Sequence, residues 1–244
     1  MAQRVRRWAP AARPIARVEL WLTPDIVALP PPRPSRCFAL VTSTNERLEP
    51  PSFTTSEAAA AFPGTNVIYP EQIVDGRVHE LGGAQLAASL AAFPALDDGG
   101  TRCFAGGAVL TPLRSHTASP LSQSFEHIVH AVAPSHGAPN WAASLGRCYG
   151  SALDLVWRSA AAAPRPASPI TVVLPLLGAG AKAVPAAAAA RIAAQSCGCW
   201  RPPCDSSSSS DSRPEMELEL LFGVQEDEVA GVTEDEFERQ SGWQ

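Results

Sequence analysis

The side chain best placed for chemistry is Asp75, which precedes Gly76 in the sequence VDGRVHELGGAQL at residues 74–86. The apolar-periodic segment that begins there predicts a helix ending near Phe93. The first amides of a helix lack partners inside the helix and carry partial positive charge. Such a helix start can hold a phosphate, and a carboxylate beside it can serve as a base. The alternative is a simple helix cap in front of an amphipathic helix.

A second candidate phosphate site lies near residue 180. Residues 170–175 (ITVVLP) predict a buried strand, residues 176–185 (LLGAGAKAVP) a glycine-rich loop, and the alanine-rich run up to Ser196 a helix. Strand, glycine loop and helix together have the geometry of a phosphate cradle. The glycine spacing matches neither a dinucleotide-binding motif nor a Walker loop, so the loop alone is a weak indication.

Two further polar side chains follow predicted strands. Residues 17–22 alternate like a half-buried strand and lead into a turn that contains Asp25 and Ile26. Residues 37–43 are apolar and β-prone, which predicts a strand buried on both faces, and Asn45 follows its end. An Asn in this position usually forms a turn.

No metal site or cofactor is predicted. His127 and His130 lie three residues apart on a predicted strand, hence on opposite faces, which favours packed or hydrogen-bonded histidines over joint metal ligands. Cys197, Cys199 and Cys204 lack the paired spacing of a zinc finger.

The charge pattern predicts a disordered tail. Residues 200–244 contain 12 acidic and 3 basic side chains, whereas residues 1–199 carry a net charge of +4. The Ser-rich run and these acids predict disorder over residues 199–244, with at most one transient helix near the apolar cluster at 218–222. Truncation after Trp200 is therefore expected to leave the melting temperature unchanged. A functional tail of this kind would engage a basic protein partner.

The N-terminal residues 1–16 predict an Arg-rich flexible leader, with an organelle transit peptide as the alternative. No apolar run reaches the length of a membrane span. Of the 19 basic residues, 18 are Arg, which we interpret as compositional bias and not as a nucleic-acid signature. Six cysteines without secretory context favour reduced thiols and an intracellular protein, cytoplasmic or nuclear.

In their order along the chain, these motifs resemble the macrodomain family, which binds ADP-ribose. Residues 23–26 (TPDI) are similar to the family's Gly-Asp-Ile-Thr, residues 41–45 (VTSTN) to its Val-Asn-Ala-Ala-Asn, and residues 74–79 (VDGRVH) to its Val-Asp-Gly-Ala-Ile-His. Residues 103–111, 128–134 and 178–184 resemble three further family motifs. The resemblance implies an α/β fold, a three-layer α/β/α domain over residues 17–198 with a mixed, mostly parallel sheet and an atypical inserted loop at residues 49–73.

The resemblance also implies roles for individual residues. Asp25 would accept a hydrogen bond from the adenine amine, with Ile26 beside the ring. Asn45 would orient the distal ribose, and Asp75 would position or activate a water. The remaining implied ligand-binding residues are Gly76 and Val78 at the helix start, and Gly178, Ala179, Gly180, Ala181 and Lys182 around the diphosphate.

The activity implied is removal of ADP-ribose from modified proteins, or of acyl groups from acylated ADP-ribose. Three departures from the family pattern bear on turnover: Thr42 replaces an Asn, the glycine tract before residue 74 is absent, and Lys182 replaces an aromatic residue. The alternatives are a non-catalytic reader of ADP-ribosylated proteins, and a degenerate domain that binds no nucleotide and acts through its acidic tail.

Overall fold

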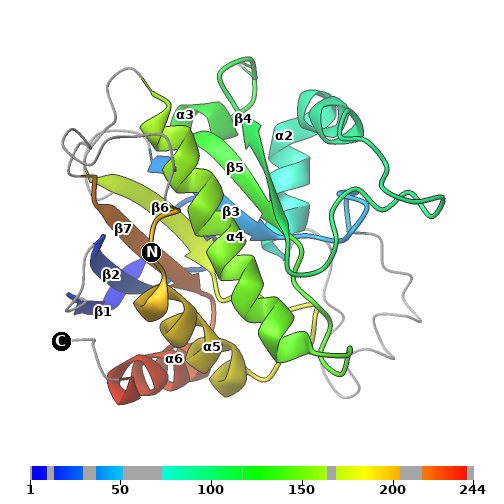
Figure 1. The fold of residues 1–244 in the computed structure, drawn as a ribbon. Coiled ribbons are helices and arrows are strands. Elements are labelled where there is room, and N and C mark those ends of the chain that lie inside the picture. Colours follow the sequence, from blue (N-terminus) through cyan, green and yellow to red (C-terminus); the bar gives the residue numbers. More distant parts are fainter. Residues whose placement is uncertain are drawn as a thin grey trace.

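The computed structural model describes residues 2–9, 14–29, 37–51, 73–116, 118–163, 169–203 and 216–240. Their strands form one mixed sheet (Figure 1). Its order is β1 (Gln3–Trp8), β2 (Ile15–Leu22), β7 (Leu218–Val224), β6 (Ile170–Pro175), β3 (Cys37–Ser43), β5 (Phe125–Ala131) and β4 (Ala108–Pro112). The five central strands are parallel and the two edge strands are antiparallel to their neighbours, as the resemblance implied.

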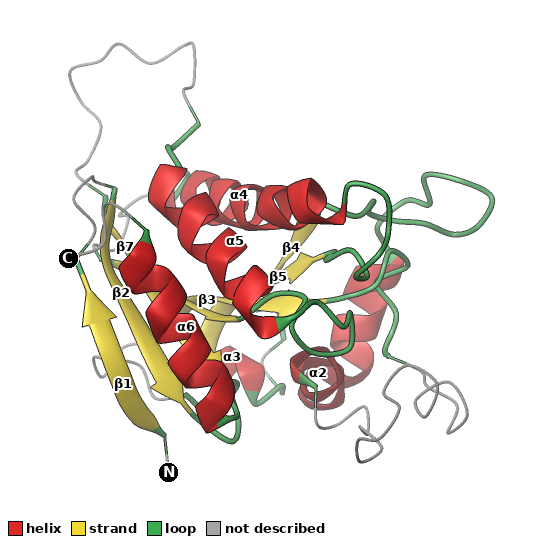
Figure 2. Ribbon diagram, turned by 90° about the horizontal axis from the view of Figure 1, so that it is seen from below, coloured by secondary structure: helices red, strands yellow, loops and turns green. Residues whose placement is uncertain are grey.

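Helices cover both faces of the sheet. One face carries α4 (Trp141–Ala161), α5 (Ala186–Cys199) and α6 (Asp227–Arg239), which pack in that order (Figure 2). The other face carries α2 (Val74–Ala91), which is kinked at Gly83, and the short α3 (Leu121–Ser124). The three-layer α/β/α architecture is therefore confirmed.

The core is divided by the sheet into two apolar clusters. In β3, Ala39 and Val41 join the cluster beneath α4, α5 and α6, whereas Leu40 joins the cluster beneath α2. All three side chains are fully buried, as expected for an apolar strand in the middle of a parallel sheet. No helix in the described ranges is long and apolar enough to cross a membrane.

The prediction of a disordered tail over residues 199–244 is wrong for residues 216–240. Strand β7 lies between β2 and β6 in the middle of the sheet, and all seven of its residues are buried. Its Glu219 is accommodated because it pairs with Arg17 of β2. Helix α6 turns Ala230, Thr233 and Phe237 inward. The acidic composition of the whole segment concealed this pattern, and residues 204–215 lie outside the described part.

The prediction of a flexible leader over residues 1–16 is also wrong where the structure describes it. Residues 3–8 form β1, and Trp8 stacks on Phe237 of α6 with ring centroids 5.1 Å apart. Arg6 pairs with Glu234 and Glu238 of the same helix, at 3.6 and 2.8 Å. The basic N-terminus and the acidic C-terminal helix thus neutralise each other, and the fold extends well beyond residues 17–198. Most of the predicted inserted loop, residues 52–72, lies outside the described residues.

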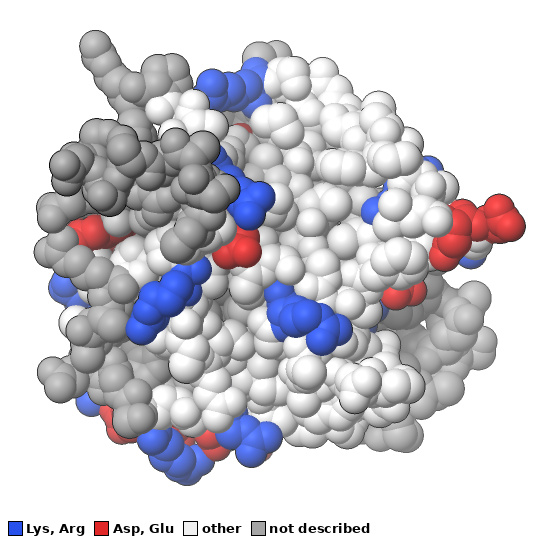
Figure 3. Space-filling model, viewed as in Figure 1, with Lys and Arg blue, Asp and Glu red and all other residues white. Residues whose placement is uncertain are grey.

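Charged groups are dispersed on the outer face of α4 and α5. Figure 3 shows basic and acidic side chains scattered there among uncharged ones. The described part of this face therefore has no continuous basic patch of the kind that binds a nucleic-acid backbone.

Candidate functional site

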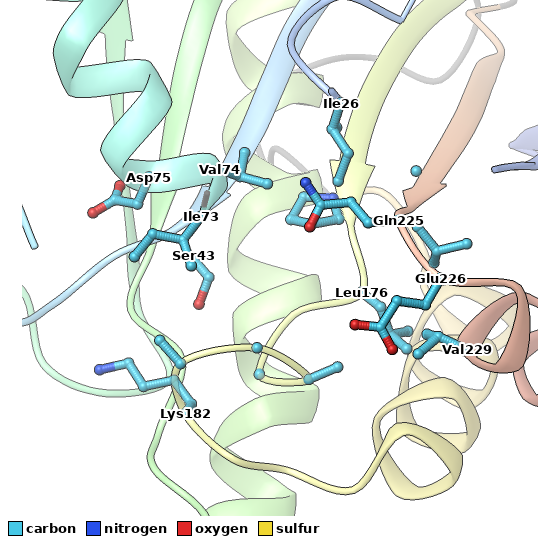
Figure 4. Close-up of a pocket in the computed structure, with 17 residues that line it drawn as sticks. Ile26, Ser43, Ile73, Val74, Asp75, Leu176, Lys182, Gln225, Glu226 and Val229 are labelled. Carbon is cyan, nitrogen blue, oxygen red and sulfur yellow. The ribbon is translucent and has the colours of Figure 1, made fainter. Parts of the chain in front are cut away.

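A cleft lies at the carboxyl ends of four adjacent parallel strands, β2, β7, β6 and β3. In open α/β sheets, this edge is where ligands bind. The cleft is open to solvent, and the space between and in front of its walls is about 840 Å³. Its walls are Ile26 after β2, Ser43 in β3, the start of α2, the loop after β6 and residues 223–226 at the end of β7 (Figure 4).

The central cleft continues in two directions. On one side it shares Ile26, Val74 and Gln225 with a second hollow that also contains Asp25 and Arg77. On the other side it shares Ser43, Asp75 and Lys182 with a hollow that reaches Asn45 and Glu46. The three hollows form one elongated groove, with Asp25 near one end and Asn45 near the other.

Asp75 lies where the central cleft meets the Asn45 end. Its carboxylate accepts hydrogen bonds from the hydroxyls of Thr42 and Thr44, both at 3.1 Å. It makes no capping bond to the helix, whose N-cap is Ile73. The alternative of a simple helix cap therefore does not describe this residue.

The environment of Asp75 favours its protonated form. Burial raises its pKa from 3.8 to about 7, although the two threonine hydroxyls and the charge of Lys182 act in the opposite direction. His79 lies one helical turn away, with its Nε2 atom 3.9 Å from the carboxylate. Burial lowers the pKa of His79 and takes that of His130 to about 3, so burial favours the neutral form of both rings. Asp75 is therefore a carboxylate that titrates near neutral pH.

Lys182 is the basic side chain of the central cleft, among the residues described. Burial lowers its pKa, whereas the charges of Glu46 and Asp75 raise it. Figure 4 shows Lys182 and Asp75 on the same side of the cleft. Lys182 thus supplies a positive charge near Asp75.

The glycine loop predicted after residue 175 lies along the floor of the cleft. Residues 178–182 all line it. Gly178 has a φ of +83°, and its carbonyl accepts a bond from the Val184 amide at 3.0 Å. Positive φ is readily adopted by glycine, so Gly178 is required for the turn that directs the loop back across the cleft.

Asp25 and Ile26 occupy the opposite end of the groove from Asn45. The Asp25 carboxylate accepts a bond from the Val27 amide at 2.9 Å and lies 3.7 Å from the guanidinium of Arg77. About a third of its side chain is exposed. Ile26 packs so closely on Gly223 that an added Cβ would lie 2.7 Å from it.

Asn45 lines the groove, but its side chain is bonded within its own loop. Its Nδ2 donates to the Glu49 carbonyl at 2.6 Å, and its Oδ1 accepts from the amides of Arg47 and Glu49. This is the turn-forming role that local sequence favoured. The Asn45 side chain could bond to a ligand only if these hydrogen bonds were broken.

The family model of the Macro domain matches residues 63–193, which is more than half of the chain and includes both α2 and the glycine loop. The chain belongs to the macro domain family. No match to this macro domain was found among curated proteins.

Solved macrodomains share its fold. The Oceanobacillus iheyensis macrodomain with ADP is 16% identical, with a TM-score of 0.62 over 98% of this chain and 95% of that one. The Trypanosoma brucei macrodomain in complex with ADP-ribose is 16% identical, with a TM-score of 0.58 over 93% of this chain and 73% of that one. At this level of identity the likeness establishes the fold.

The macro domain groups most of the predicted site residues along the groove, with two exceptions. Val78 is fully buried in the apolar cluster beneath α2 and does not reach the groove. Gly76 is buried within the first turn of α2 and lines none of the three hollows. Val78 lies on the face of α2 that packs on the sheet, and Gly76 has no side chain that could reach the groove.

Sequence reasoning missed one wall of the groove. Gly223, Val224, Gln225, Glu226 and Val229 all line the central cleft. The apolar run at residues 220–224 was the pattern that could have identified β7, and with it a loop at the same end of the parallel strands as Asn45. In the described part of the macro domain, no group of three His, Cys, Asp or Glu side chains could hold a metal ion.

Proposed function

We propose that this macro domain binds ADP-ribose in the groove and hydrolyses the bond that joins its distal ribose to an acyl group or a protein carboxylate. The observation that carries the proposal is the position of Asp75. It is a buried carboxylate with a pKa of about 7, placed between the glycine loop and the Asn45 end. A general base is most effective when its pKa lies near the working pH.

The groove has a suitable arrangement of groups for each part of the ligand. The adenine would lie at the Asp25 and Ile26 end, and the diphosphate along residues 178–182, where loop amides and Lys182 favour an anion. The distal ribose would then lie beside Asp75 and Asn45. The O. iheyensis and T. brucei macrodomain structures with ADP and ADP-ribose support this choice of ligand.

In the proposed reaction, a water attacks the anomeric carbon of the distal ribose and gives its proton to Asp75. The carbon–oxygen bond to the acyl or carboxylate group breaks, and the leaving carboxylate departs with the bonding electrons. The products are ADP-ribose and a carboxylate, and Asp75 then releases the proton to solvent. The bonds from Thr42 and Thr44 fix the carboxylate in place while leaving it further lone pairs to accept from water.

A non-catalytic reader is the second candidate, and two observations favour it. The Asn45 amide is engaged within its own loop, and Lys182 offers no flat surface for the distal ribose. Misplacing a substrate by about 1 Å can cost on the order of 100-fold in rate. We therefore expect a slow enzyme.

The test is release of ADP-ribose from a protein that is mono-ADP-ribosylated on acidic side chains. Replacing Asp75 by Asn keeps the side-chain volume and should slow release by about 10²–10⁴-fold, the usual contribution of a positioned acid–base group. Affinity for ADP-ribose should change far less, because the base acts mainly in the transition state. The wild-type rate should rise as the pH increases through about 7, as Asp75 ionises.

Asp98→Asn is the matched control, because Asp98 is an exposed loop carboxylate outside the groove. The Asp98→Asn variant should release ADP-ribose at the wild-type rate. If wild type binds ADP-ribose but releases none even at high enzyme concentration, the hydrolase proposal fails and the reader remains.

A further inference from the structure

Glu226 is an acidic side chain in a cleft that otherwise favours anions. Among the described residues that line the central cleft, its only acidic companion is Asp75, which lies on the opposite side (Figure 4). Figure 4 shows the Glu226 carboxylate directed into the cleft from the loop between β7 and α6. A carboxylate here repels a phosphate, so Glu226 would have to contact another part of the ligand.

Among the described residues, no capping bond, hydrogen bond or ion pair of the Glu226 side chain accounts for this position. It is the N-cap residue of α6, but its side chain makes no capping bond, and only its backbone carbonyl accepts from the Ala230 amide. Its carboxylate has no hydrogen-bond or ion-pair partner within the part of the chain that the structure describes. The acceptor oxygens of Glu226 are therefore available to a ligand.

Its place along the groove indicates which ligand group it would meet. Glu226 follows Gln225, whose Nε2 donates to the Pro24 carbonyl at 3.2 Å, next to Asp25. Glu226 also shares the central cleft with Gly178 and Ala179 of the glycine loop. It thus lies between the adenine end and the diphosphate loop, where the ribose of the adenosine half would be.

We propose that Glu226 binds the hydroxyl pair of the adenosine ribose and thereby excludes nucleotides that carry a phosphate on that ribose. This inference rests on the proposed binding of ADP-ribose. A carboxylate can accept from two adjacent hydroxyls, and an acidic residue at this point of a nucleotide is known to select a free 2′-hydroxyl. A 2′-phosphate would instead bring two negative groups together without an intervening cation.

The test is calorimetric titration of the full chain with ADP-ribose and with ADP-ribose 2′-phosphate. Wild type should bind ADP-ribose about 10-fold or more tightly than the 2′-phosphate, because of like-charge repulsion. Glu226→Gln should weaken ADP-ribose binding roughly 10-fold, through loss of a charged acceptor, and bring the two affinities together. Glu226→Lys should reverse the preference.

Glu228→Gln is the matched control. Glu228 is exposed in the first turn of α6 and does not line the cleft, so this variant should keep the wild-type preference. Equal melting temperatures would show that all variants are folded. An unchanged preference in Glu226→Gln, with ADP-ribose still bound, overturns this inference alone, whereas absence of ADP-ribose binding by wild type overturns the proposed function as well.

Discussion

Asp75 carries a free-energy cost that the rest of the fold must offset. Its carboxyl is 4% exposed, and burial disfavours the charged form. Its pKa is 3.8 in an unfolded chain and about 7 in the folded one. Between these values the folded state holds a proton that the unfolded state has lost, so this residue lowers stability as the pH rises from about 4 to about 7.

Asp75→Asn should therefore stabilise the protein at high pH and not at low pH. Each pKa unit is worth about 1.4 kcal/mol, so the variant should gain on the order of a few kcal/mol at pH 8 over wild type. The gain should shrink towards zero at pH values well below 3.8, where the carboxyl is protonated in both states. Chemical unfolding of both proteins at the two pH values measures this difference. An equal difference at both pH values would contradict the burial of an ionisable Asp75.

Single residues were predictable where the controlling chemistry is local. Asp75 and Gly178 stand at a helix start and in a glycine loop that short stretches of sequence define. The turn formed by Asn45 also follows from its own side chain and the next four residues. The burial of Val78 was not predictable from its motif, because it depends on which face of α2 meets the sheet.

At the scale of elements, the glycine loop depends on one backbone conformation. Gly178 has a positive φ, and an added Cβ would lie 3.0 Å from Val184 Cγ2. Gly180 in the same loop has open space around it. The two glycines therefore differ in tolerance of a methyl group, although both line the cleft.

Gly178→Ala should lower the melting temperature by about 2–4 °C, which corresponds to roughly 1 kcal/mol of left-handed strain in a chain of this size. Gly180→Ala should leave the melting temperature within about 1 °C of wild type, since its Cβ meets no atom. Differential scanning calorimetry of wild type and the two variants measures these melting temperatures. Equal melting temperatures for both variants would show that the loop does not need its positive φ.

Elements with strong periodicity were predicted well, and β7 and α6 were not. Strands β3 and β6 have their predicted bounds because apolar runs define them, and α2 ends two residues before the predicted Phe93. The acidic composition of residues 199–244 suggested disorder, yet Glu219 of β7 is buried against Arg17, about 200 residues earlier. A partner so distant in sequence is invisible to local pattern and composition.

At the scale of the whole molecule, the two ends of the chain complete the sheet. Strand β7 joins β2 to β6, so without it β1 and β2 would lose their connection to the other strands. Helix α6 covers β2 and β7 and packs against α5. The last part of the chain is thus a central component of the fold, contrary to the expected independence of residues after Trp200.

Truncation after Trp200 should abolish cooperative thermal unfolding. The single change Phe237→Ala, which empties a fully buried site in α6, should cost about 3–5 kcal/mol. Asp235→Ala on the exposed side of the same helix should cost less than about 0.5 kcal/mol. Denaturant unfolding monitored by circular dichroism measures the free energy of unfolding and the cooperativity of each protein. Cooperative unfolding of the truncated chain at the wild-type midpoint would contradict the central place of β7.

The central claim is that the groove at the strand ends binds ADP-ribose, and calorimetric titration of the purified chain tests it most directly. Wild type should bind one equivalent with micromolar affinity, about −8 kcal/mol. Asp25→Ala should weaken binding by about 1.5–3 kcal/mol if a buried hydrogen bond to the adenine is lost. Absence of binding to folded protein at millimolar ADP-ribose would contradict the account and leave a macro domain that holds no nucleotide.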